Sequence, residues 1–177
     1  MTYGKREAIL GALKEVCGME QKSLARWLKL MILVVGVCCL AVYFLVIPAY
    51  GGSLRDEYPE FAYCFWPWVI FLWVSALPVL AALGLGWRVA ANIGRDASFS
   101  MDNARLLRRI AWLAAGDTVY LFLGNLVLLL LGMNHPGIAL LLMLAVFVGA
   151  AAAVAAGVLS HLVQKAARLQ EDSDLTI

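Results

Sequence analysis

Residues 118–164 read TVYLFLGNLVLLLLGMNHPGIALLLMLAVFVGAAAAVAAGVLSHLVQ and contain no Lys, Arg, Asp or Glu. A helix needs about 20 consecutive apolar residues to cross the roughly 30 Å hydrocarbon layer of a membrane, so this stretch is too long for one crossing. The segment Gly132-Met-Asn-His-Pro-Gly137 inside it is a strong turn signal. The stretch therefore predicts most of one membrane helix, at about 110–131, and all of another, at about 138–160.

Two further uncharged stretches precede this one in the chain. They span Leu30–Leu54 and Phe61–Trp87, and they predict membrane helices at about 27–50 and 64–87. The composition agrees, because 63% of the residues are hydrophobic, whereas soluble domains have roughly 45–50%. The sequence thus predicts an all-α, polytopic bundle of four transmembrane helices.

The expected organisation has three parts. Residues 1–26 form a cytoplasmic amphipathic helix, residues 27–163 form the transmembrane domain with a cytoplasmic loop at 88–109, and residues 164–177 form a cytoplasmic acidic tail. Thirteen of the 14 Lys and Arg residues lie before the first helix, in this loop or in the tail, and only Arg55 lies on the other side. Because positive segments are retained on the cytoplasmic side, both termini are predicted to be cytoplasmic. The membrane helices make the lipid bilayer an expected partner.

The N-terminal segment from Glu7 to Met19 has the pattern of an amphipathic helix. Its apolar residues share one helical arc, and Glu7, Lys14 and Glu15 lie opposite. Two interpretations remain open for it. The helix lies in the inner membrane interface, or it is a docking surface for a cytoplasmic partner.

Several function classes lack their motifs. The chain has no His-Glu-x-x-His sequence, no nucleophile elbow and no paired intramembrane carboxylates, so no catalytic residue is predicted. Its four cysteines show no Cys-x-x-Cys pair and no His at zinc-binding spacing, so no metal or cofactor is expected. Topology explains the positive residues, and the net charge is only +2. Direct nucleic-acid binding is therefore not predicted.

Asp117 is the one acidic residue within the predicted membrane helices. It follows Arg109 by eight residues, which places it about 12 Å along the helix axis and close to mid-membrane. An intramembrane acid is a candidate functional site by default, and Thr118 and Asn125 are nearby polar residues. Two interpretations remain open: a proton or cation site, or a protonated or hydrogen-bonded residue that holds the bundle together.

Small residues recur at every fourth position of the last helix, at Gly149, Ala153 and Gly157. Such a stripe lets another helix approach closely. The partner helix belongs either to the same chain or to a second copy in a homo-oligomer.

Two segments on the predicted cytoplasmic side carry a resemblance to a known family. Residues 92–110 contain the series Phe99, Ser100, Asn103, Leu107 and Ile110, and the chain ends in an acidic stretch followed by Leu-Thr-Ile. With four hydrophobic segments in this order, the chain resembles the bacterial membrane family called domain of unknown function 2975. The resemblance implies the bacterial cytoplasmic (inner) membrane as location and a small DNA-binding regulator of the helix-turn-helix type as a partner.

These segments predict a cytoplasmic interaction surface, in which the acidic tail pairs with the Arg-rich loop and Ser100 caps the following helix. Its residues are Phe99, Ser100, Asn103, Arg105, Arg108, Arg109, Glu171, Asp172, Asp174, Leu175, Thr176 and Ile177. The leading hypothesis is a regulatory or scaffold protein that binds a soluble partner there. The alternative is a small transporter, exporter or immunity-type membrane component that uses Asp117.

Overall fold

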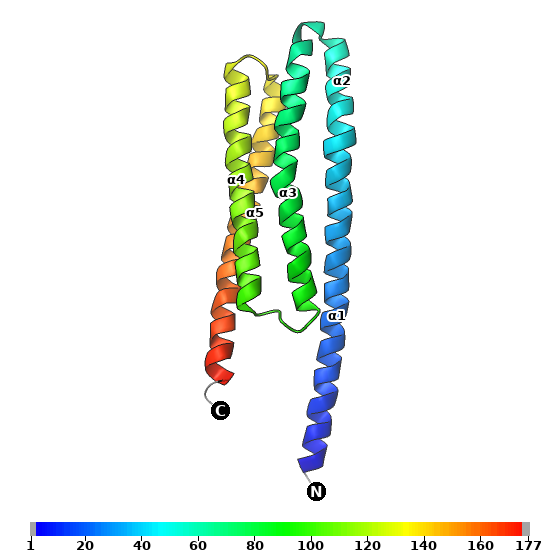
Figure 1. The fold of residues 1–177 in the computed structure, drawn as a ribbon, viewed down its shortest axis with the longest axis vertical. Coiled ribbons are helices and arrows are strands. Elements are labelled where there is room, and N and C mark those ends of the chain that lie inside the picture. Colours follow the sequence, from blue (N-terminus) through cyan, green and yellow to red (C-terminus); the bar gives the residue numbers. More distant parts are fainter. Residues whose placement is uncertain (1–2, 175–177) are drawn as a thin grey trace.

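The computed structural model is built from helices joined by short turns (Figure 1). It describes the backbone of residues 3–174 and the side chains of residues 21–172. The amphipathic face of Glu7–Met19 and the tail residues Asp174, Leu175, Thr176 and Ile177 therefore lie outside the described side chains. The elements in chain order are α1 (Tyr3–Ala41), the π-helix η1 (Val42–Val46), α2 (Ile47–Glu57), the 3₁₀-helix η2 (Pro59–Cys64), α3 (Phe65–Ile93), α4 (Met101–Leu130) and α5 (Pro136–Asp174).

Four segments are long and apolar enough to cross a membrane. They are Gln21–Glu57, Pro59–Ile93, Met101–Leu130 and Pro136–Asp172. The first span is composite, because α1, η1 and α2 follow one another without a break. The predicted all-α fold with four membrane-spanning helices is thereby confirmed.

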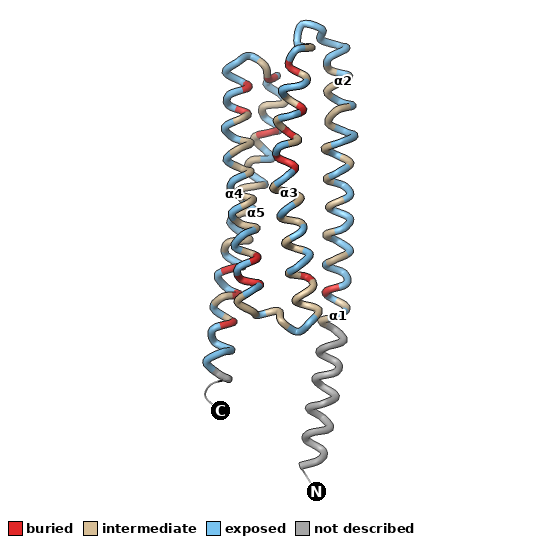
Figure 2. The backbone as a smooth tube through the Cα atoms, viewed as in Figure 1, coloured by how far each residue is buried: buried red, intermediate tan, exposed pale blue. Residues whose placement is uncertain are grey.

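Few residues of the spans are buried (Figure 2), and many of their large apolar residues are exposed. Leu77 is 67% exposed and Leu130 is 78% exposed, whereas the buried core holds few large side chains. Soluble monomers rarely expose contiguous apolar surface on this scale. A helix bundle in a membrane needs such an apolar surface where it contacts lipid.

The spans are arranged in the packing order α1, α3, α4 and α5. The most extensive helix pair is α4 with α5, followed by α3 with α4 and α1 with α3. Glycines allow close approach between α4 and its neighbours. A Cβ on Gly149 would lie 2.5 Å from Thr118 Oγ1, a Cβ on Gly157 would lie 3.9 Å from Ala111 Cβ, and a Cβ on Gly124 would collide with the Phe71 ring of α3. The α5 stripe at Gly149 and Gly157 therefore faces α4 of the same chain.

The α4–α5 turn ends one helix and starts the next within a few residues. Gly132 has a φ of +67°, a conformation that glycine adopts without strain. The N–H of Met133 donates to Leu128 O at 2.9 Å and that of Gly132 to Leu129 O at 3.1 Å, which is a Schellman arrangement. Pro136 then opens α5, where its missing N–H costs no helical hydrogen bond.

Candidate functional site

A chain of hydrogen bonds joins three helical segments within the membrane-spanning part of the protein. Ser75 Oγ of α3 donates to Asp117 Oδ2 of α4 at 3.1 Å, and Tyr43 OH of η1 lies 3.3 Å from Ser75 Oγ. Ser75 has a single hydroxyl proton, so once that proton points at Asp117, the Tyr43 hydroxyl donates to Ser75 Oγ. Ser75 is fully buried. We call this set of side chains the polar chain: Tyr43, Ser75 and Asp117.

The π-helical turn η1 fixes Tyr43 against α3. The indole N–H of Trp73 donates to the backbone oxygen of Tyr43 at 2.9 Å, and the rings of Phe44 and Trp73 are 5.5 Å apart. π-Helical turns are rare and occur frequently at functional sites. A hydrogen bond and a ring contact thus hold the η1 backbone that carries Tyr43 against α3.

One oxygen of Asp117 is left without a partner. Asp117 Oδ1 is buried and forms no hydrogen bond with any residue that the structure describes. A buried polar atom that is unpaired costs about 1–3 kcal/mol, and more if it is charged. A proton on Asp117 would neutralise the carboxylate, and a small cation would give Oδ1 a partner, so the site has the chemistry to hold either.

The other two residues predicted to accompany Asp117 lie in separate arrangements. Thr118 Oγ1 donates to Ala114 O of its own helix at 2.7 Å. Asn125 is buried, accepts a 2.6 Å hydrogen bond from Asn134 and donates to Ala139 O at 3.1 Å. Asn125 therefore joins α4 to the α4–α5 turn and to α5.

Sequence reasoning missed two residues of the polar chain. Ser75 contacts Asp117 directly, and Tyr43 contacts Ser75. Each is a polar side chain within a long apolar span, which was the available signal. Which of the other polar residues faces Asp117 depends on how the helices are rotated against each other. The sequence alone, which has no internal repeat, does not show how the helices are rotated.

A second cluster lies at the other end of α3 and α4, where the loop 94–100 connects them. Asn103 Nδ2 donates to Ala97 O at 2.9 Å and to Ser98 O at 3.1 Å, while Asn103 Oδ1 accepts a 2.8 Å bond from Asn92 Nδ2. The backbone N–H of Asn103 donates to Ser100 Oγ at 3.2 Å, so the expected N-cap is confirmed. Asn103 is 1% exposed and holds the loop from inside.

Several predicted surface residues surround this loop. Phe99 is 60% exposed, and Arg105, Arg108 and Arg109 are exposed on the first turns of α4. Arg105 Nη1 pairs with Asp102 Oδ1 at 3.3 Å within α4. Glu171 and Asp172 are exposed on α5, which continues as a helix to Asp174. α5 is fixed to the start of α4 by Ser160 Oγ, which donates to Ala104 O at 2.7 Å.

No metal-binding group is formed by the described residues, since they contain no cluster of three or more His, Cys, Asp or Glu side chains. Cys38, Cys39 and Cys64 are free thiols. The described residues thus form a membrane bundle that contains an intramembrane polar chain and a loop held by Asn103.

Four apolar spans with these internal polar contacts define a multi-pass helical membrane protein. The chain belongs to the family described as protein of unknown function (DUF2975), whose sequence model matches residues 49–177. It is also 26% identical over 153 residues to the uncharacterized membrane protein YoaS of Bacillus subtilis (strain 168), a match that covers 85% of this chain and 96% of that protein. No solved structure matches the chain. The expected family membership is confirmed.

Proposed function

We propose that this membrane protein is a non-enzymatic regulatory or scaffold partner, which presents the face around Phe99 to a soluble cytoplasmic protein. The observation that carries the proposal is an exposed aromatic ring on an internally braced loop. Phe99 is 60% exposed, whereas Asn103, four residues further along the chain, is buried and makes hydrogen bonds to the backbone of that loop.

A rigid loop favours binding because little conformational entropy remains to be lost. Ordering a free loop costs roughly 1–2 kcal/mol per residue, and Asn103 has already removed much of that freedom. Aromatic and Arg side chains are also the residues that most often dominate interface energies. Phe99 lies close in sequence to Arg105, Arg108 and Arg109, which are exposed on the following helix.

The proposed partner is a small helix-turn-helix regulator, as the family resemblance implies. Binding at the membrane would keep such a regulator away from DNA. Its release would allow it to bind DNA again. The proposal places the Phe99 face, both termini and the Arg residues in the cytoplasm, in the inner membrane of a bacterium, as the distribution of Lys and Arg indicates.

The test is an affinity pull-down in mild detergent, with partners identified by mass spectrometry. Wild-type protein should recover a helix-turn-helix protein, and Phe99→Ala should lose most of it. The matched control is Tyr63→Ala, which removes an aromatic side chain that is 63% exposed in η2. Equal recovery by all three proteins would contradict the assignment of Phe99 to the binding face.

A second candidate function is movement of a proton or cation through the membrane. The unpaired buried Asp117 Oδ1 favours it, because that atom is a vacant acceptor at the end of the polar chain. Such a path would use Tyr43 and Ser75 as its next polar groups. Proton or cation flux into proteoliposomes that carry Asp117→Asn separates this function from a structural role for Asp117.

A further inference from the structure

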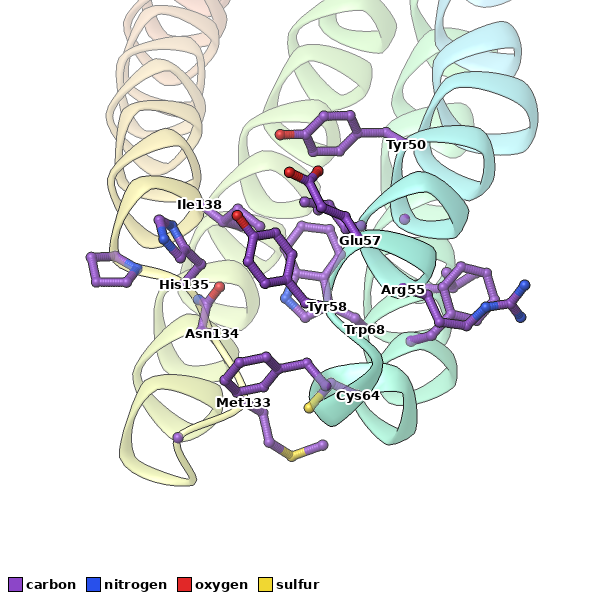
Figure 3. A pocket seen from close by; sticks show the side chains of 17 residues that line it. Tyr50, Arg55, Glu57, Tyr58, Cys64, Trp68, Met133, Asn134, His135 and Ile138 are labelled. Carbon is purple, nitrogen blue, oxygen red and sulfur yellow. The ribbon is translucent and has the colours of Figure 1, made fainter.

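A cavity of about 460 Å³ lies at the end of the bundle that carries η2 and the α4–α5 turn (Figure 3). Small-molecule sites have volumes of roughly 300–1,000 Å³. The last turns of α2, the corner between η2 and α3, and the turn before α5 line it. The cavity shares no lining residue with the polar chain or with the Phe99 loop, so it is a separate site.

Aromatic side chains make up much of the cavity wall. The lining includes Tyr50, Tyr58, Phe61, Phe65 and Trp68. The face of an aromatic ring is negative and attracts cations, most strongly for Trp. Groups of such rings are a common way to bind an ammonium group in water-accessible sites.

One carboxylate supplies the negative charge. Glu57 lines the cavity, and in Figure 3 its carboxylate points toward the space that Tyr50, Tyr58 and Trp68 border. Within residues 21–172 no hydrogen bond or ion pair is made by the Glu57 side chain. Its charge is therefore free to meet a ligand.

Arg55, the one Lys or Arg among the residues that line the cavity, contacts two neighbouring side chains. Arg55 Nε lies 3.5 Å from Asp56 Oδ1, and its guanidinium carbon lies 5.3 Å from the centroid of the Phe65 ring. Figure 3 shows the Arg55 head group directed away from the Glu57 carboxylate. The lining therefore carries one negative and one positive side chain, and the Arg55 guanidinium is directed away from the Glu57 carboxylate.

The imidazole of His135 also lines the cavity. Its Nδ1 accepts a 3.1 Å hydrogen bond from the N–H of Gly137. The cavity therefore combines one carboxylate, an imidazole and several aromatic faces, with the Arg55 guanidinium directed away from the carboxylate.

Other ligand classes fit this chemistry poorly. An anion would meet the Glu57 carboxylate and the negative ring faces, whereas the Arg55 guanidinium points away from the Glu57 carboxylate. A divalent metal ion needs several oxygen or nitrogen ligands, and the described residues form no group of three His, Cys, Asp or Glu anywhere. An organic cation satisfies both the carboxylate and the apolar wall.

We propose that this cavity binds an organic ammonium cation, with its charged nitrogen next to Glu57 and among the rings of Tyr50, Tyr58 and Trp68. The ammonium group belongs either to a free solute or to the head group of a lipid such as phosphatidylethanolamine. The inference is independent of the proposed regulatory function.

The experiment is calorimetric titration of the full-length protein in nanodiscs of phosphatidylglycerol, a lipid with no ammonium group. The probes are choline and 3,3-dimethylbutanol, which have the same shape but differ in charge. Choline should bind at millimolar or lower concentration and the neutral alcohol at least about tenfold more weakly. No binding of choline, or equal binding of the two probes, would overturn the proposal.

Two variants with matched controls locate the site. Glu57→Gln and Trp68→Leu should each weaken choline binding by about tenfold or more. Glu60→Gln and Trp66→Leu, neighbours that do not line the cavity, should leave it unchanged. Glu57 is exposed, so its Gln variant should unfold at the wild-type temperature. Unchanged choline binding by Glu57→Gln would also overturn the proposal.

The lipid composition distinguishes the two sources of the ammonium group. If the natural occupant is a lipid head group, nanodiscs with added phosphatidylethanolamine should show weaker apparent choline binding, because the lipid competes. If it is a free solute, the lipid should leave choline binding unchanged. Either result supports an ammonium site provided that Glu57→Gln has lost binding.

Discussion

Ser75 Oγ lies 3.1 Å from Asp117 Oδ2, so a buried hydroxyl on α3 holds the only acid that sits well inside the apolar part of α4. Ser75→Ala should leave both Asp117 and Tyr43 without this partner. The expected loss of stability is about 1–3 kcal/mol, the usual cost of orphaned buried polar groups. Thermal unfolding in detergent measures it.

The control is Ser53→Ala, which removes an exposed hydroxyl and should change stability by less than about 0.5 kcal/mol. Equal stability of Ser75→Ala and wild type would show that the bond contributes nothing.

Asp117→Asn separates the two interpretations of this residue. The amide has nearly the same shape as the acid and still accepts a hydrogen bond from Ser75, so the protein should insert and fold. If Asp117 carries a proton or cation across the membrane, flux into proteoliposomes should fall to the background of empty vesicles. Flux in the variant equal to that of wild type would eliminate the transport function based on this residue.

The spans were predictable from sequence because charges are expensive in hydrocarbon, so their absence marks each crossing directly. Gly132 and Pro136 likewise mark the α4–α5 turn by local backbone chemistry. Asp117 and Asn125 are predicted from sequence as one polar site, but the structure holds them in separate arrangements. The two residues are eight positions apart on one helix, or about 12 Å, and each is held by a different neighbour.

The π-helical turn and the Asn103 contacts were also beyond sequence reasoning. The sequence of Val42–Val46 reads as an ordinary apolar helix, and the Trp73 side chain that contacts the turn comes from another helix. The Ser100 cap was predicted because it depends on residues three apart. The Asn92–Asn103 bond was not, because it depends on the path of the whole loop.

Gly124 should be intolerant of a side chain because it lies against the Phe71 ring. Gly124→Ala should lower stability by about 1–3 kcal/mol, as overpacking does elsewhere. The matched control is Gly84→Ala, where a Cβ meets no atom within 4 Å. The double variant with Phe71→Leu should recover part of the loss. If Gly124→Ala is as stable as Gly84→Ala, α3 and α4 do not approach each other as described.

Cysteine labelling tests the orientation on which the proposed function depends. In a background without native cysteines, Ser53→Cys should react with a membrane-impermeant maleimide in intact spheroplasts. Ser98→Cys should react only after lysis, because the Lys and Arg distribution places its loop in the cytoplasm. Labelling of Ser98→Cys in intact spheroplasts would contradict that orientation.

Photo-crosslinking in living cells tests the central proposal, that the loop carrying Phe99 meets a soluble partner. A benzophenone amino acid in place of Phe99 should yield, on irradiation, one covalent adduct that contains a helix-turn-helix protein. The same amino acid at Tyr63, an equally exposed position in η2, should yield no such adduct. Adducts at Phe99 with lipid alone, or the same protein adduct from both positions, would contradict the account.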